Sequence, residues 1–461
     1  MNIGLSGGAQ QRPAGTGSGE GRRPRLRTSL LLTAVGAGLV AISAFGILQP
    51  HPAAAPTALV RAPATIAPAP DALQTSITKA QSQLRSEPGD WGAWATLGSA
   101  YVQEARITAD PSYYPKAEGA LNHSLQLRPE GNVTAMVGMA ALTSARHEFT
   151  VSLEWGMRAE AAAPSAAAVY GVIDDALTQL GRYPEARAAA QHMLDLAPSI
   201  SSFARASYDL EEHGDVVGAT AALQRALVDA FTPADVAFCR YYLGELAFNS
   251  GRLSEAMHQY QLGRQADAAY FPLLEGVAKV EAAIGQVPAA LRDYNELLAR
   301  VPLPQYVNEL LDYEQSLGRT HDAAAQRSLF DTEAQLFTAN GVDVDLEAAI
   351  LDADHGDPAA AVRHAQLEWS RRHSVLVADA LAWALHAAGR NSEALGYANQ
   401  ALSLGWRNAL LHFHRGMIEA ALRMPAAARS DLAAAEAINP YFSTLWGGQA
   451  QRTLASLGGA P

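Results

Sequence analysis

Histidine is the residue type whose spacing first suggests chemistry in this chain. Six of the 13 histidines lie between residues 355 and 414, where imidazoles from stacked helices could converge on a metal ion. They are His355, His364, His373, His386, His412 and His414. His412 and His414 are two residues apart, so on one helix they point about 200° apart and cannot share a simple site. We expect packing or surface histidines, and keep a metal-handling accessory protein that uses these His-rich C-terminal repeats as the alternative function.

Other reactive groups give weaker signals. Cys239 is the single cysteine, which excludes an internal disulfide, and its helical context favours a buried, inert thiol. Asp352, Asp354 and Gly356 resemble part of a calcium loop, but the glycine comes one place too early. The sequence contains no G-x-S-x-G elbow, P-loop lysine, H-E-x-x-H pair or dinucleotide-binding fingerprint. We therefore predict no catalytic, cofactor-binding or metal-binding residue, and a protein that is not an enzyme.

The charge balance argues against nucleic acid as a partner. The 461 residues contain 46 Asp and Glu against 34 Lys and Arg, a net charge of -12. A nucleic-acid binder needs a basic face that displaces counterions from phosphate. We expect other proteins or peptides as partners instead.

The first 72 residues divide into three segments. Residues 1–27 are rich in Gly, Ser and Arg and predict a disordered cytoplasmic tail. Residues 28–48 form an uncharged run of 21 residues, long enough for a helix across a bilayer core about 30 Å thick. Because basic residues precede this run, we expect the N-terminus in the cytoplasm and the remainder outside. Residues 49–72 are rich in Pro and Ala and predict a semi-rigid linker.

A cleaved signal peptide is the competing interpretation of residues 28–48. Ala53 and Ala55 have the small-x-small spacing of a cleavage site. Signal-peptide cores usually span about 7 to 15 apolar residues, so the longer run favours an uncleaved anchor. The expected location is the cell membrane, with a single span and an extracytoplasmic repeat region. Cleavage would instead give a secreted protein.

The rest of the chain repeats one pattern of glycine and small residues. A turn glycine recurs at intervals of 33 to 38 residues, and Arg423 continues the register. These glycines are Gly181, Gly214, Gly251, Gly285, Gly318, Gly356 and Gly389. An alanine stands five residues after each of the eight positions, as expected where antiparallel helices approach closely. The predicted packing residues are Trp94, Leu97, Gly98, Tyr101, Ala186, Ala219, Gly244, Ala256, Ala290, Ala323, Ala361, Ala394, Gly416 and Ala428.

These features resemble the tetratricopeptide repeat family. Residues 94–101 read W-x2-L-G-x2-Y, the opening of such a repeat, and the interval centres on its 34-residue period. The match is weak in residues 131–164. The resemblance, to a bacterial extracytoplasmic type with an N-terminal membrane segment, implies an all-α, right-handed superhelical solenoid of about ten antiparallel helix pairs over residues 73–440. Residues 441–461 would supply a C-terminal capping helix and tail.

One stripe of the first helices is predicted to line a concave, protein-binding groove. The stripe is rich in acids and aromatics, and Lys279 is the one lysine in it. Its candidate residues are Asp175, Tyr208, Glu211, Glu212, Tyr241, Glu245, Phe248, Glu275, Asp312, Asp379, Trp383 and Phe413. We expect a non-enzymatic scaffold that binds a basic or aromatic-containing segment of another envelope protein. The alternative is that an acidic solenoid is simply acidic over its whole surface.

Overall fold

A computed structural model describes residues 72–458 of the chain. The predicted tail (1–27), membrane segment (28–48) and linker (49–72) lie outside the described residues, apart from residue 72 itself. Within the described part, no helix combines the length and apolar character needed to cross a membrane.

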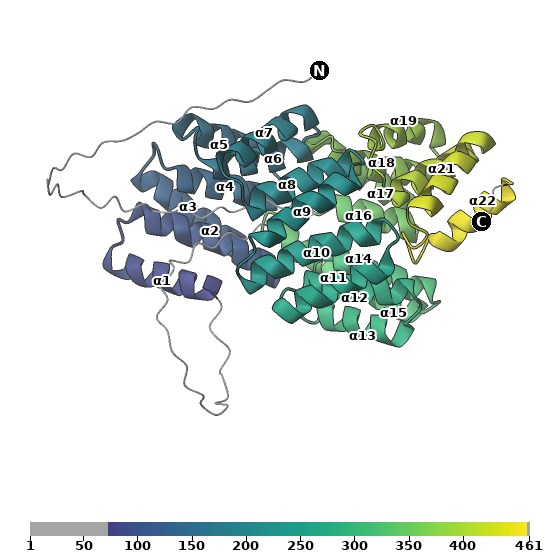
Figure 1. The fold of residues 1–461 in the computed structure, drawn as a ribbon, viewed down its shortest axis with the longest axis horizontal. Coiled ribbons are helices and arrows are strands. Elements are labelled where there is room, and N and C mark those ends of the chain that lie inside the picture. The colour runs from purple at the N-terminus through teal and green to yellow at the C-terminus, as the bar shows by residue number, and fades with distance from the viewer. Residues whose placement is uncertain (1–71, 459–461) are drawn as a thin grey trace, which may run out of the picture. The chain divides into compact units, whose positions relative to one another are not determined.

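The described residues form 22 α-helices and no strand (Figure 1). The bounds are α1 Ala72–Ser86, α2 Trp91–Thr108, α3 Tyr113–Leu127, α4 Val133–Ala145, α5 Phe149–Ala162, α6 Ala167–Gln179, α7 Tyr183–Leu196, α8 Ile200–Glu212, α9 Val216–Val228, α10 Pro233–Asn249, α11 Leu253–Ala266, α12 Pro272–Ala283, α13 Val287–Leu298, α14 Pro304–Ser316, α15 Thr320–Ala339, α16 Asp345–His355, α17 Pro358–Arg371, α18 Val375–Ala387, α19 Asn391–Ala401, α20 Ala409–Ala421, α21 Pro425–Ile438 and α22 Gly447–Ser456.

The helices form ten consecutive pairs, from α2 with α3 to α20 with α21. Helix α1 packs on the first pair and α22 on the last, and the core runs as a series of apolar clusters between successive pairs. This arrangement confirms the predicted all-α solenoid of about ten pairs.

The turn glycines have the backbone conformation that their recurrence predicts. All seven have positive φ, from 70° at Gly251 to 98° at Gly356, and Arg423 has φ 60° in the same register. Glycine carries no Cβ penalty in this left-handed region, so it ends the first helix of a pair and turns the chain into the second. His147, with φ 65°, makes the same turn between α4 and α5. A histidine at this position explains why the repeat was hard to recognise in residues 131–164.

The small residues occupy the helix contacts. The repeat alanines are buried; Ala219, Ala256, Ala290, Ala361, Ala394 and Ala428 are fully inaccessible. A Cβ atom added at Gly244 of α10 would lie 2.2 Å from the Tyr260 ring of α11. The absence of a side chain at Gly244 therefore allows the two helices to approach and bury the tyrosine.

A Gly244→Ala substitution should lower the free energy of unfolding by about 1–3 kcal/mol, because the new methyl group overpacks the contact with Tyr260. Gly396→Ala is the matched control, since a Cβ there would have no atom within 4 Å. Alanine has the higher helix propensity, so the control should gain up to about 1 kcal/mol. Urea unfolding measures both. Equal effects of the two substitutions would contradict the packing role.

Turns of early pairs also touch connections far along the chain. Added Cβ atoms at Gly181 and Gly214 would lie 2.4 Å and 2.5 Å from the carbonyl oxygens of His373 and Gly405. An added Cβ atom at Gly251 would lie 3.3 Å from the Cδ atom of Pro440. The partners are 189 to 192 residues apart in each case, so the contacts form a regular seam between distant pairs.

Candidate functional site

Several of the predicted groove residues take part in side-chain hydrogen bonds that connect the first helices of successive pairs. Side chains on one first helix bind a carboxylate on a neighbouring one at nearly every step. We call the set Asp175, Glu211, Glu245, Glu275, Asp312, Asp354 and Asp379 the acidic stripe. Its members come in order from α6, α8, α10, α12, α14, α16 and α18.

Arg205 is a buried cation that pairs with the acidic stripe. It was not predicted from the sequence. Its guanidinium is fully buried in α8 and makes two bonds to Asp175, at 2.9 and 2.8 Å. It also donates to the carbonyl of Gly171 and lies 3.6 Å from Asp174. Burial and the neighbouring Asp175 raise the pKa of Asp174 well above its ordinary value, although Arg205 opposes the shift. This end of the stripe is therefore compensated by an internal arginine.

Around Lys279, carboxylates outnumber the cation. The Lys279 ammonium lies 2.9 Å from both carboxylate oxygens of Glu245 and 2.6 Å from Glu275, which is almost fully buried. Tyr241 donates a further hydrogen bond to Glu275 at 3.2 Å. Burial raises the pKa of Glu275 to about 7, against the attraction of Lys279. Burial, and then the charge of Glu275, raise the pKa of Glu309 well above its ordinary value. Several acids thus compete for one ammonium group.

The negative charge of Glu211 is compensated still less by neighbouring groups. Its carboxylate accepts one hydrogen bond, at 3.3 Å, from the amide of Asn249. Burial raises its pKa to about 7, opposed by the Asn249 bond and helped by the charge of Glu245. Glu212 is more deeply buried, and burial raises its pKa well above the usual range. Glu211 remains partly exposed and is the least compensated accessible member of the stripe.

Histidines and tryptophans bind the acids in the C-terminal part of the acidic stripe. His355 bonds to Asp312 at 2.7 Å, and His414 lies 2.9 Å from Asp379. Asp354 accepts hydrogen bonds from the indoles of Trp383 and Trp446 at 2.6 and 3.0 Å. Burial, followed by the charge of Asp312, raises the pKa of Asp354 to about 6.

The predicted aromatic residues divide into two groups. Phe248, Trp383 and Phe413 are buried and belong to the core clusters. Tyr208 and Tyr241 are partly exposed. Of the predicted aromatic residues, Tyr208 and Tyr241 are therefore the two whose rings a partner could contact in this conformation.

The C-terminal histidines do not converge. His364, His386 and His412 bind Asp345, Asn391 and Asp431, and His373 packs against Trp369. Among the described residues, the one grouping with metal-ligand spacing contains no histidine. The alternative of a His-based metal site therefore gains no support from the described part of the chain.

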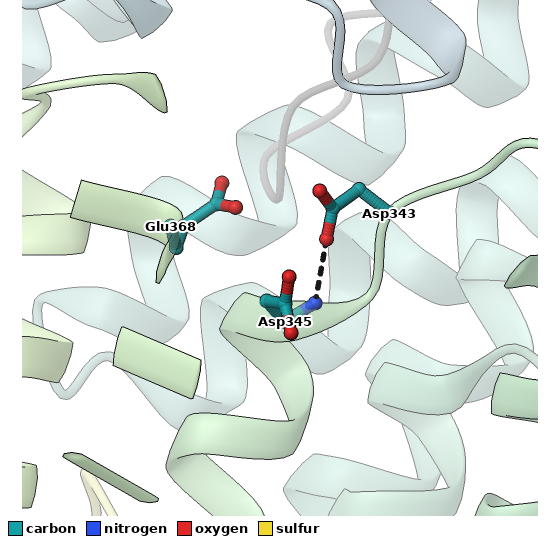
Figure 2. A group of neighbouring side chains, drawn as sticks. All are labelled: Asp343, Asp345 and Glu368. Carbon is teal, nitrogen blue, oxygen red and sulfur yellow. Dashed lines mark hydrogen bonds between the residues drawn. The ribbon is translucent and has the colours of Figure 1, made fainter. Parts of the chain in front are cut away.

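That grouping consists of Asp343, Asp345 and Glu368 (Figure 2). Asp343 accepts a hydrogen bond from the backbone amide of Asp345 at 3.0 Å, and Arg371 contacts all three carboxylates. Burial alone would raise the pKa of Asp345, but hydrogen bonds from His364, Asp343 and Arg371 bring it well below its ordinary value. The guanidinium supplies the positive charge that a metal ion would otherwise provide.

The other sequence signals are structural. Burial raises the pKa of Cys239 to about 12, so its thiol stays protonated. Gly356 caps α16 with φ 98°, and Asp352 pairs with Arg327 at 2.7 Å. The short calcium-like motif is therefore a repeat turn.

The comparisons with known proteins find distant structural similarity. No protein-family description and no curated protein matches the chain. A tetratricopeptide repeat protein from Parabacteroides merdae is 21% identical, with TM-score 0.34 over 56% of this chain and 98% of that one. The Cut9–Hcn1 hetero-tetramer of the APC/C is 16% identical, with TM-score 0.39 over 84% and 83%. A tetratricopeptide repeat protein from Thermus thermophilus is 19% identical, with TM-score 0.35 over 45% and 98%.

The helix pairs and turns of the chain itself define its class as an all-α solenoid of antiparallel helix pairs, the fold that the resemblance to tetratricopeptide repeats implies. Its function has to be argued from its own side chains.

Proposed function

We propose that the repeat region is a non-enzymatic scaffold whose acidic stripe binds a basic segment of another protein. The observation that carries this proposal is the shortage of cations along the stripe. Glu245 and Glu275 share the ammonium of Lys279, and Glu211 has an amide as its hydrogen-bond donor. A carboxylate held away from water without a cation is unfavourable, and a lysine or arginine of a partner would relieve that cost.

The two accessible tyrosines support the same kind of ligand. Tyr208 and Tyr241 lie among the carboxylates, where their rings offer apolar contact area and a face for a cation. A segment that carries Lys or Arg beside apolar residues would use both features. Charge would favour encounter and register, while the rings would add contact area.

The proposed location follows from the sequence that precedes the repeats. The uncharged run at 28–48, with basic residues before it, favours a single membrane span and an extracytoplasmic repeat region. The linker at 49–72 would hold the repeats away from the bilayer. Basic segments of envelope proteins are then the expected partners, and cleavage after Ala55 would release the same scaffold.

Glu211→Gln should weaken binding of a fluorescent Lys/Ser repeat peptide about tenfold, because one charged contact of about 1.4 kcal/mol is lost. Affinity for the wild-type chain should rise from pH 6 to pH 8, since the pKa of Glu211 is about 7 and ionisation increases over this range. Fluorescence anisotropy with full-length protein in detergent measures both effects. A Glu/Ser peptide controls for charge, and Glu154→Gln alters an exposed helical acid outside the stripe.

Equal weakening by Glu154→Gln would show that diffuse surface charge attracts the peptide, as the alternative of a generally acidic surface predicts. A pH-independent affinity would argue that Glu211 does not contact the ligand.

A further inference from the structure

The second helix of one pair lies farther from the next first helix than the other second helices do. Helices α3, α5, α7, α9, α11, α13, α17 and α19 each pack against the first helix of the next pair. Helix α15, the longest at 20 residues, lies farther from α16 and contacts it through side chains: Arg327 pairs with Asp352, and Phe330 shares a core cluster with Ala348 and Leu351. Its C-terminal part packs instead against the N-terminal helix pairs, where Phe337 belongs to the core cluster around Leu142. The regular stacking of the solenoid is interrupted at this step.

A cavity of about 1250 Å³ lies at the interruption. One wall is a single face of α15, with lining residues spaced three and four apart: Arg327, Phe330, Asp331, Ala334 and Thr338. His364, Leu367 and Arg371 of α17 form another wall, and the start of α5 closes one end. Eleven residues separate Arg327 from Thr338, which corresponds to a groove about 16 Å long, or three helical turns. We call this cavity the α15 groove.

The α15 groove has an apolar lining with accessible side chains. Phe330 lies at its base, and the small side chain of Ala334 leaves room above α15. Val151 and Leu367 line the groove with 39% and 48% of their surface exposed. Exposed aliphatic side chains next to a helix-sized space are suited to the apolar face of an amphipathic helix.

The charges around the α15 groove favour a basic ligand. Three arginines and five acids line it, a balance of -2 with neutral histidines (3 - 5). The arginines are held by carboxylates: Arg146 by Glu118, Arg327 by Asp352 and Arg371 by Asp345, at 2.9, 2.7 and 2.5 Å. The exposed carboxylates Glu148 and Asp331 remain at the surface of the groove, and Asp331 makes just a long 3.4 Å contact with Arg327.

We infer that the α15 groove receives an amphipathic helix of a partner protein, which lays its apolar face on α15 and α17 and directs Lys or Arg toward Asp331 and Glu148. The ligand fills the space between α15 and the neighbouring helices α16 and α17, both of which line the groove. The volume exceeds the roughly 300–1,000 Å³ of typical small-molecule pockets, which favours a polypeptide. The groove contains none of Glu211, Glu245 and Glu275, so this inference is independent of binding at the acidic stripe.

The test is a selection from a phage library of 15-residue amphipathic helices. Their apolar stripe is varied among Ala, Val, Leu and Ile, and the flanking positions among Lys, Arg, Glu and Asp. Selection on the immobilised full-length protein should enrich Lys and Arg at the flanks. Thr338→Trp places a large side chain at one end of the groove and should weaken the enriched helices at least tenfold. Ala325→Trp introduces the same side chain at an exposed position on the opposite side of α15 and should leave their affinity unchanged.

A charge-reversal variant tests whether the exposed carboxylate of Asp331 contacts the basic residues of the bound helix. Asp331→Lys should lower the affinity of the basic helices about fivefold or more and shift a repeated selection toward Glu and Asp. Circular dichroism of each variant checks that the helical fold is retained. A library without enrichment would overturn the inference, and so would enriched helices that bind Thr338→Trp as well as Ala325→Trp. Glu211→Gln should leave these helices bound, which separates this result from a failure of the acidic stripe.

Discussion

Replacing Arg205 by Met should lower the free energy of unfolding at pH 8 by about 3–5 kcal/mol, the usual cost of removing one partner from a buried ion pair. Methionine retains much of the length and apolar surface of the arginine stem. The substitution leaves Asp174 and Asp175 without the guanidinium that lies 3.6 Å and 2.8 Å from them. It also removes the donors that bind the carbonyls of Gly171 and Ser201. Urea unfolding followed by circular dichroism measures the loss.

The loss caused by Arg205→Met should become smaller as the pH falls from 8 to 5. Burial and Asp175 already raise the pKa of Asp174 in the folded protein, and removal of Arg205 eliminates the opposing attraction. A carboxyl with a raised folded-state pKa favours the folded state at low pH, where it is protonated, and loses that contribution as the pH rises. The variant should therefore approach wild-type stability most closely under mildly acidic conditions.

A double variant separates the charge effect from lost packing. Arg205→Met combined with Asp175→Asn removes one unpaired charge and should recover about 1–2 kcal/mol of the loss at pH 8. Asp195→Asn, a substitution at an exposed position on α7, is the control and should recover nothing. A loss independent of pH and unaffected by Asp175→Asn would mean that Arg205 acts through packing alone.

The helix pairs could be predicted from the sequence because each depends on local and periodic requirements. A turn with positive φ favours glycine, and a close helix contact favours alanine or glycine, so both leave a fixed interval in the chain. Gly181 and Gly244 illustrate the two requirements. His147 shows the limit, because one non-glycine turn residue was enough to obscure a pair that the structure contains.

Less of the candidate site could be predicted from the sequence in this way. The stripe was located by counting from the turns, but partners such as Arg205 and His414 lie nine residues before a turn, outside the positions counted. That shared position was the signal that could have identified both. Burial of Phe413 depends on packing between α20 and later helices, which helical periodicity does not specify. The α15 groove depends on the wide spacing between α15 and α16, and a repeat pattern predicts contacts rather than gaps.

The seam between distant pairs is the feature that no local pattern encodes, and Arg372 lies at its first contact, next to His373. This side chain is 1% exposed and binds Glu368 and Gln179, the latter 193 residues away. Its guanidinium also lies 4.8 Å from the ring centroid of Phe149. The arginine thus joins α17 to the ends of two earlier helices, α5 and α6.

Arg372→Met should therefore lower the free energy of unfolding by about 3 kcal/mol, toward the low end for a broken buried pair because Arg371 still binds Glu368 at 2.8 Å. The backbone amide of Val375, which donates to the hydroxyl of Tyr183 across the seam at 2.7 Å, should exchange its hydrogen faster. The pKa of His147 should rise from about 4, because burial and then the charge of Arg372 lower it.

Hydrogen exchange and NMR titration of His147 measure the two local effects, and Arg371→Met is the matched control. Arg371 binds the same Glu368, but its other partners are Asp343 and Asp345 and not Gln179 or Phe149 in the described part of the chain. It should cost stability without exposing the Val375 amide. If both variants exchange this amide equally fast, the seam is held by general packing, and Arg372 is one of many contacts rather than the residue that fastens distant repeats together.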